Sequence, residues 1–328
     1  MDSEPSSARR RGARTAPAFV VVGALAVCSC SLFVDTSGFD GRAPADAGAG
    51  SFEASHDVAD DAPSGDAPSE QCPDGGATSV ECVTREIPTE GLVLWLRADD
   101  GVETTADGRV TAWRDGVAKL RPGYIGMNAV QNDPGAQPLR VVESTGSAVV
   151  FGPNDVLELP PGFEDFSKGL SVFAVIWPQF DAEGWAGHVF SLGYSEQVCG
   201  RSGELIAGST AGYGFGYRVE AGVGETHNAL DGRGWDVVSV VHGGWQSKSE
   251  CSHAVPVRLR RATEVKATET IESLTKGVRA GSRLGRSVYY PTEYYNGKLG
   301  ELLLYDRALD DQQVERVARY LGRRWPRP

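Results

Sequence analysis

The sequence predicts an all-β protein, an antiparallel jelly-roll sandwich of two sheets that ends in a short helix. Many short segments are rich in β-branched and aromatic residues, and clusters of Gly, Pro, Asn and Asp separate them. The chain holds 41 glycines, and no helical periodicity is sustained before the C-terminus. Evenly spaced strands with turn signals between them are typical of a sandwich, which protects most strand edges by packing and curvature.

The predicted strands fall within residues 87–328, a length that sandwiches commonly use as one domain. No second break in composition interrupts this range, so we expect a single domain. The segments expected to form strands are Gly91–Leu96, Val110–Trp113, Ala148–Phe151, Leu170–Trp177, His188–Leu192, Tyr213–Val219, Trp235–Val241, Val255–Leu259, Arg283–Gly285 and Leu299–Tyr305.

One helix is expected at the end of the chain. Asp310 is a good N-cap, and Gln313 follows it at the spacing of a capping box. Arginines lie toward the C-terminal end, where the helix dipole favours positive charge, and Gly322 is expected to end the helix. The apolar stripe that docks it on the sandwich consists of Val314, Val317 and Leu321.

The N-terminus has the three-part layout of a secretory signal. Arginines at positions 9, 10, 11 and 14 precede an uncharged run from Ala16 to Cys28, which is too short to span a bilayer. The residues Val27-Cys28-Ser29-Cys30 resemble the lipobox of bacterial lipoproteins, with Cys30 as the acylated residue and 1–30 as the signal peptide. Cys28 fits less well because Val27 precedes it; an ordinary signal peptide is the alternative. The resemblance implies an exported protein, held by acyl chains at the outer membrane or cell surface of a bacterium.

Residues 31–86 are expected to form a disordered, acidic tether built from Ala, Asp, Gly, Pro and Ser. Such a composition buries too little apolar surface to offset the entropy lost on ordering. Ten acidic residues against the single Arg42 lie between Ser31 and Val80, so this tether supplies most of the net charge of −12. No basic stripe accompanies it, and a nucleic-acid partner is therefore not expected.

Four cysteines remain outside the signal, an even number in a chain bound for an oxidising compartment. We expect two disulfides, and of the three possible pairings we favour Cys72 with Cys82 and Cys199 with Cys251. None of the cysteines has CxxC spacing, and the histidines form no paired-ligand pattern, so a zinc site is not expected.

The two ends of residues 87–325 resemble laminin G-like domains of the concanavalin A-like lectin/glucanase superfamily. The opening resemblance lies in Gly91–Asp99 and Val110–Asp115, and the closing one in Tyr295–Asp311, which runs G-K-L-G-E-L-L-L-Y-D-R-A-L from Gly297. The resemblance implies the jelly-roll fold and structural roles for Glu301 and Asp306, the latter on turn amides. It does not specify a function, because this fold hosts lectins, hydrolases and adhesion modules alike.

Catalysis is not expected. The glucanases of this superfamily carry Glu-x-Asp-x-x-Glu on one strand, because retaining hydrolysis needs two carboxyl groups about 5 Å apart. The sequence has no such run; Glu264, Glu269 and Glu272 are spaced so that one strand face does not hold all three. The alternatives to a binding module are a divergent glycan hydrolase or lyase, and a structural envelope protein without a ligand.

We expect a non-catalytic binding or adhesion module for a polysaccharide, glycoconjugate or envelope protein. Aromatic rings in turns stack on sugar faces, and the candidate ligand contacts are Tyr289, Tyr290, Tyr294, Tyr295, Trp185 and Trp245.

A second aromatic set lies in the predicted strand at Tyr213–Tyr217, which places Tyr213, Phe215 and Tyr217 on one face. We expect buried packing there, with a glycine-floored groove as the alternative. No cofactor is required, but the superfamily resemblance implies a possible Ca²⁺ site, for which the candidate ligands are Asp99, Asp100 and Asp115.

Overall fold

The structure is a computed structural model that describes residues 85–144, 146–182, 185–195, 203–206, 213–219, 222–245, 253–274, 276–288, 290 and 292–326. The expected signal peptide, acylated Cys30, acidic tether and disulfide cysteines Cys72, Cys82, Cys199 and Cys251 all lie outside the described residues. Within the described part, no helix has the length and apolar character needed to cross a membrane.

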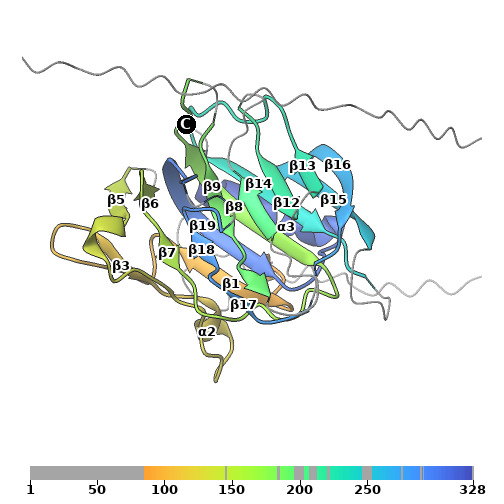
Figure 1. The fold of residues 1–328 in the computed structure, drawn as a ribbon, viewed down its shortest axis with the longest axis horizontal. Coiled ribbons are helices and arrows are strands. Elements are labelled where there is room, and N and C mark those ends of the chain that lie inside the picture. Colours follow the sequence, from red (N-terminus) through yellow and green to blue (C-terminus); the bar gives the residue numbers. More distant parts are fainter. Residues whose placement is uncertain are drawn as a thin grey trace, which may run out of the picture. The chain divides into compact units, whose positions relative to one another are not determined.

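Two antiparallel sheets form the sandwich, as the strand pattern predicts (Figure 1). Among the described residues sheet A has eight strands, in the order β16 (Glu264–Glu272), β15 (Ala254–Arg261), β14 (Asp236–His242), β8 (Leu170–Pro178), β19 (Gly297–Tyr305), β6 (Gly146–Phe151) and β5 (Leu139–Glu143), with β1 (Leu92–Arg97) also on β19.

Sheet B has nine strands in the described part of the chain. Their order is β13 (Gly222–Glu225), β12 (Gly216–Val219), β11 (Gly203–Ile206), β9 (His188–Ser191), β18 (Arg283–Leu284), β7 (Leu157–Glu158), β4 (Ala129–Val130), β3 (Val110–Trp113) and β2 (Val102–Thr104). A separate short pair joins β10 (Tyr194–Ser195) to β17 (Arg279–Ala280). The short helical turns are α2 (Val117–Leu120) and η1 (Pro134–Ala136).

The centre of sheet A is buried on both faces, which explains its continuous apolar sequence. Strands β8 and β19 read LSVFAVIWP and GKLGELLLY, and nearly every residue in both is buried. One face packs on sheet B in a core that includes Phe190, Leu284 and Leu304. The opposite face packs on helix α3 (Asp311–Arg324) in a second core. Each fully buried large apolar side chain contributes roughly 1.5–3 kcal/mol, so the molecule has three layers held by two apolar interfaces.

Helix α3 begins as predicted but ends later. The Asp310 side chain accepts a hydrogen bond from the backbone amide of Gln313, and the Gln313 side chain accepts one from the backbone amide of Asp310, so the capping box is confirmed. The prediction that Gly322 ends the helix is wrong, because the helix continues to Arg324. Bonds from Arg324 and Trp325 to sheet A outweigh the local preference for stopping at glycine.

The segment predicted as a strand from Tyr213 is shorter than expected. Strand β12 begins at Gly216, and Tyr213 adopts a positive φ of 45° outside it. Phe215 and Tyr217 are buried as expected, whereas Tyr213 is 44% exposed and packs edge-on against Phe180. The strand prediction therefore fails at its first residues, and the shared aromatic face is reduced to two members.

A buried polar contact crosses the core between the two sheets. The Tyr217 hydroxyl on β12 lies 2.9 Å from Nδ1 of His242, on β14. Both side chains are at most 1% exposed. Burial lowers the pKa of His242 to about 3 because the charged ring would lose its hydration. His242 is therefore neutral in the folded protein at ordinary pH.

Candidate functional site

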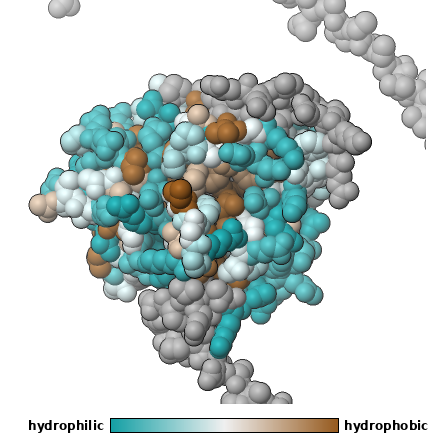
Figure 2. Space-filling view, turned by 90° about the horizontal axis from the view of Figure 1, so that it is seen from below, coloured by the Kyte–Doolittle hydropathy of each residue, from teal (hydrophilic) through white to brown (hydrophobic). Residues whose placement is uncertain are grey.

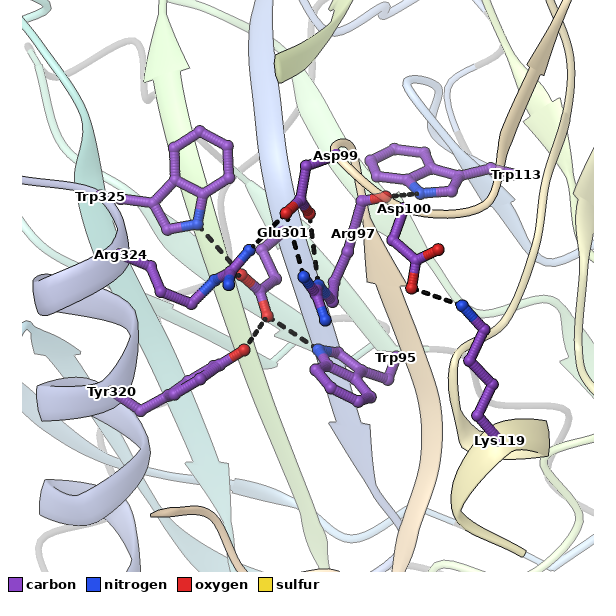
Figure 3. A network of polar contacts seen from close by, with 10 residues as sticks. All are labelled: Trp95, Arg97, Asp99, Asp100, Trp113, Lys119, Glu301, Tyr320, Arg324 and Trp325. Carbon is purple, nitrogen blue, oxygen red and sulfur yellow. Dashed lines mark hydrogen bonds and ion pairs between the residues drawn. The ribbon is translucent and has the colours of Figure 1, made fainter. Parts of the chain in front are cut away.

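A fully buried carboxylate holds helix α3 to sheet A (Figure 3). Glu301 on β19 is fully buried. Its Oε1 accepts hydrogen bonds from the Trp95 indole at 2.7 Å and the Tyr320 hydroxyl at 3.2 Å. Its Oε2 accepts from the Trp325 indole at 3.0 Å and from Arg324 Nε at 3.2 Å. Four donors enclose both oxygens, so Glu301 has the structural role that the closing motif implies.

Two of the candidate calcium ligands bind basic side chains next to this network. Asp99 accepts from Arg97 at 3.0 Å and from Arg324 at 2.8 Å. Burial alone would raise the pKa of Asp99, but the hydrogen bond from Arg97 and the charge of Arg324 outweigh it and lower the pKa. Asp100 pairs instead with Lys119, at 2.5 Å (Figure 3). Each carboxylate is thus neutralised by a cation of the chain.

The third candidate, Asp115, is buried and fixes a turn. Its carboxylate accepts hydrogen bonds from the backbone amides of Trp95, Val117 and Met127 at 2.9–3.0 Å. Burial raises its pKa despite these bonds. The structure does not bring Asp99, Asp100 and Asp115 together, and among the described residues no cluster of three or more His, Cys, Asp or Glu side chains is arranged to hold a metal ion.

Hydrogen bonds hold the tyrosine-rich loop between β18 and β19 to strand β9 and join the two ends of the loop to each other. Gly285 donates its amide to the Val189 carbonyl, and the Tyr295 amide returns to the Gly285 carbonyl. At its centre the Val288 amide donates to the Ser191 hydroxyl. The close approach requires glycine at position 187, where a Cβ would lie 1.7 Å from the carbonyl oxygen of Tyr294. We call the described residues between 286 and 294 the β18–β19 loop; it contacts strand β9 of sheet B.

Three of the aromatic rings predicted to bind a ligand lie at this loop or beside it. Trp185 packs edge-on against His188 with ring centroids 5.5 Å apart, and Tyr290 lies 6.3 Å from the same ring. His188 is fully buried and its Nε2 lies 2.5 Å from a carboxylate oxygen of Glu293. Tyr290 is 43% exposed. Trp185, His188, Tyr290, Glu293 and Tyr294 form what we call the loop cluster.

Two arginines complete the loop cluster from either side. The guanidinium of Arg218, on β12, lies 5.2 Å from the ring centre of Tyr290. Arg286 forms an isolated backbone β-bridge with Tyr294, and its guanidinium lies 5.0 Å from the centre of the Tyr294 ring. Stacking of this kind holds the planar cation in place and leaves its edge free to hydrogen-bond. The sequence analysis missed both arginines, because nothing in the local pattern relates position 218 to position 290.

Other predicted contact residues lie elsewhere. Tyr295 is fully buried: its ring packs against Phe151 and its hydroxyl donates to the Lys298 carbonyl, so the prediction that Tyr295 contacts a ligand is wrong. The side chain of Tyr295 points into the core, just before strand β19 begins. Trp245 is half-buried, stacks on His253 and donates to the Leu274 carbonyl, away from the loop cluster. Tyr289 lies outside the described residues.

Two hollows lie near the turn that Asp115 fixes. A cavity of about 260 Å³ is lined by Val93, Tyr124, Met127, Phe163, Glu164, Asp165, Phe166 and Asp306. An open apolar groove shares Met127 with it and is lined by Ile125, Val130 and the prolines at 160 and 161. From below Figure 1, apolar residues are seen gathered in the middle of the surface, within a hydrophilic surround (Figure 2). The loop cluster differs from both hollows in combining aromatic rings with cations.

The glutamates of strand β16 do not form a catalytic pair. Glu269 lies opposite Val257 of β15 and Glu272 opposite Ala254, so the two carboxylates fall on opposite faces of the strand. Glu264 pairs with Lys266 at 2.6 Å. The spacing argument from the sequence is therefore confirmed for this strand.

No protein-family model matches the chain, and no curated protein matches it. Solved structures with a similar fold include domain 4 of AbnA, a GH43 extracellular arabinanase from Geobacillus stearothermophilus, in complex with arabinotriose. It is 16% identical, with a TM-score of 0.43, and the match covers 69% of this chain and 98% of that one. The CBM40 of the Ruminococcus gnavus IT-sialidase bound to α2,3-sialyllactose is 16% identical, with a TM-score of 0.33 and coverage of 50% and 96%.

A sialidase of Trypanosoma rangeli is 12% identical, with a TM-score of 0.44, over 72% of this chain and 33% of that one. At such identities and TM-scores the similarity assigns neither a family nor a function to this chain. The arguments that follow rest on the residues of the loop cluster.

Proposed function

We propose that this protein is an exported, lipid-anchored, non-catalytic module that binds carbohydrate at the loop cluster. The observation that carries the proposal is the convergence of Trp185 and Tyr290 on the buried His188. Two segments that are distant in the sequence thus each place an aromatic ring beside the same polar side chain, His188. Sugar rings have apolar faces and polar edges, so a binding site for them combines stacking rings with hydrogen-bonding groups.

The polar groups of the loop cluster suit the edges of a sugar. Glu293 is 37% exposed and is held by His188, so its carboxylate has a fixed position from which to accept hydrogen bonds. Arg218, stacked on Tyr290, supplies donors on the neighbouring strand. Because the loop is bonded to β9 and its two ends are bonded to each other, these groups lose little freedom on binding, which favours affinity.

The absence of catalysis remains part of the proposal. Retaining and inverting hydrolysis both need two carboxyl groups that face one sugar. Among the side chains described in the loop cluster, Glu293 is the one carboxylate, and the deeper Glu301 is enclosed by four donors on the opposite side of sheet A. The exposed Asp181 accepts a hydrogen bond from the Trp185 amide and is a further carboxylate beside the cluster; a hydrolase or lyase would need it to face the same sugar as Glu293.

The test is a glycan array probed with the protein, a Tyr290→Ala variant and a Tyr213→Ala variant. Tyr213 is a matched control because it is 44% exposed, against 43% for Tyr290, and packs on Phe180, which is not a member of the loop cluster. We expect Tyr290→Ala to weaken binding about tenfold or more, equivalent to at least 1.4 kcal/mol, and Tyr213→Ala to leave it unchanged. A blank array would overturn the carbohydrate proposal and favour a protein partner or a purely structural role.

Lipid anchoring is tested separately in a bacterial host by metabolic labelling with palmitate. We expect wild-type protein and Cys28→Ser to be labelled and to sediment with membranes, and Cys30→Ser to be unlabelled. Labelling that survives Cys30→Ser but disappears in Cys28→Ser would move the anchor to Cys28. The absence of label from all three proteins would favour an ordinary cleaved signal peptide.

A further inference from the structure

The two arginines of the loop cluster have no counter-ion among the side chains that the structure describes. The Nε atoms of Arg218 and Arg286 are buried without a hydrogen-bond partner among the described residues. Neither guanidinium forms an ion pair with a side chain that the structure describes. Their contacts are the rings of Tyr290 and Tyr294. A stacked cation keeps its charge and most of its donors available for another group.

Several arginines of sheet A pair with a carboxylate of the chain. On sheet A, Arg97 reaches Asp99 at 3.0 Å, Arg260 reaches Asp311 at 2.6 Å, and Arg261 reaches an oxygen of Asp236 at 2.7 Å. Removing a charge from water is costly unless an opposite charge or hydrogen bonds compensate it. Arg140 also lacks an ion pair among the described residues, but Arg218 and Arg286 both stack on rings of one loop, so this surface presents two cations beside aromatic rings to an anion from outside the chain.

The chemistry of the missing partner follows from the guanidinium. Its fork of N–H groups matches the two oxygens of a carboxylate or a sulfate and forms bidentate bonds with them. Glu293 is the nearest carboxylate on the described part of the loop, and His188 already holds it at 2.5 Å. The cations of the site thus lie beside the 43% exposed ring of Tyr290 and the half-buried ring of Trp185.

We propose that the loop cluster binds an acidic glycan, whose anionic groups pair with Arg218 and Arg286 while its sugar rings lie against Tyr290 and Trp185. This inference rests on the proposed carbohydrate-binding function and names its ligand class. The acidic net charge of the chain does not oppose it, because ten of the acidic residues lie between Ser31 and Val80, before the sandwich.

The test uses the full chain and three soluble polysaccharides, a polygalacturonate, a sulfated galactan and a neutral galactan, in a titration at low and high salt. Variants are Arg218→Gln, Arg286→Gln and the control Arg140→Gln. Arg140, on β5 of sheet A, is a matched control because it is half-buried and its Nε also has no partner in the described structure. Urea unfolding of each variant shows whether it is folded.

We expect binding to one or both acidic polymers, weakened by salt because ion pairs are screened. Each loop-cluster variant should lose about tenfold in affinity, while Arg140→Gln loses none. Arg218→Lys should retain more affinity than Arg218→Gln, because it keeps the charge and not the bidentate fork. Binding confined to polygalacturonate supports the inference with a carboxylate as the anion; binding confined to the sulfated galactan supports it with a sulfate.

Other outcomes overturn the inference in distinguishable ways. Equal binding of the neutral galactan, unaffected by Arg218→Gln and Arg286→Gln, would overturn the acidic ligand and leave the carbohydrate proposal standing. Equal losses in Arg140→Gln would show unspecific attraction to positive charge and would overturn the site. Failure to bind any polysaccharide, on these polymers and on the array, would overturn both the acidic ligand and the proposed function.

Discussion

Replacing Glu301 with glutamine tests the role assigned to the buried carboxylate between sheet A and helix α3. The change keeps the size of the side chain but removes its charge and turns one acceptor oxygen into an amide donor. Whichever way the amide points, its NH₂ group faces two of the four donors that now bond to the carboxylate. Two hydrogen bonds are therefore lost and two pairs of donors are brought face to face.

The magnitude follows from the burial of the site. A hydrogen bond to a charged group contributes about 1.5–3 kcal/mol, and breaking a buried ion pair by removing one partner costs about 3–5 kcal/mol. Glu301 is fully buried and Arg324 is 18% exposed, so solvent screens the pair only weakly. We expect Glu301→Gln to lower the free energy of unfolding by about 3–5 kcal/mol.

The assay is urea unfolding at pH 7 followed by tryptophan fluorescence, since Trp95 and Trp325 contact the substituted group. The matched control is Glu315→Gln on the exposed face of helix α3, where a 3.8 Å pair with Arg319 should contribute no more than about 0.5 kcal/mol. A Glu301→Gln protein within about 1 kcal/mol of wild type would refute the reasoning, because it would mean that the helix docks through its apolar stripe alone.

Three further predictions concern the core, the loop and the helix end. His242, with a pKa of about 3 when folded against 6.5 when unfolded, stabilises the protein above pH 6.5 and loses that contribution as pH falls toward 3. Between pH 7 and pH 5 the free energy of unfolding, measured in urea, should fall by about 2 kcal/mol more in wild type than in His242→Gln. An equal fall in both proteins would contradict the lowered pKa. Gly187→Ala would place a Cβ against the Tyr294 carbonyl, so we expect the free energy of unfolding to fall by more than about 2 kcal/mol and glycan binding to weaken. An unchanged thermal midpoint would contradict the close approach. Gly322→Ala lies inside helix α3 with open space around its Cβ, and calorimetry should show a gain of about 0.5–1 kcal/mol; a destabilised variant would indicate that the helix does end at Gly322.

Sequence analysis located the strands whose side chains are mostly buried. Strand β3 has the predicted bounds Val110–Trp113, and β8 differs from its prediction by one residue at the end. Strand β16 was not predicted, because its sequence EVKATETIE is largely exposed and charged and is kept in the sheet by pairing with β15. An edge strand of this kind takes its conformation from its neighbour more than from its own composition.

The residues of the site also divide into those that the sequence predicted and those that it did not. Tyr290, Tyr294 and Trp185 were found from the sequence because aromatic residues among turn residues are unusual enough to suggest a binding surface. Tyr295 was included wrongly, since one residue of difference decides whether a side chain points outward or into the core. Arg218 and His188 were missed, because they reach the β18–β19 loop only through strand pairings and ring contacts that join distant segments.

The sequence by itself determined the features that depend on neighbouring residues: the all-β class, the capping box of helix α3, and the turn-rich loop with its tyrosines. Periodicity, capping and turn chemistry act over a few residues and are therefore visible in the chain. The tertiary structure alone decided which strands share a sheet, why helix α3 passes Gly322, and how Arg218 comes to lie on Tyr290. These depend on burial and charge compensation between residues far apart in the chain, whose free energy exists only once the sheets have packed.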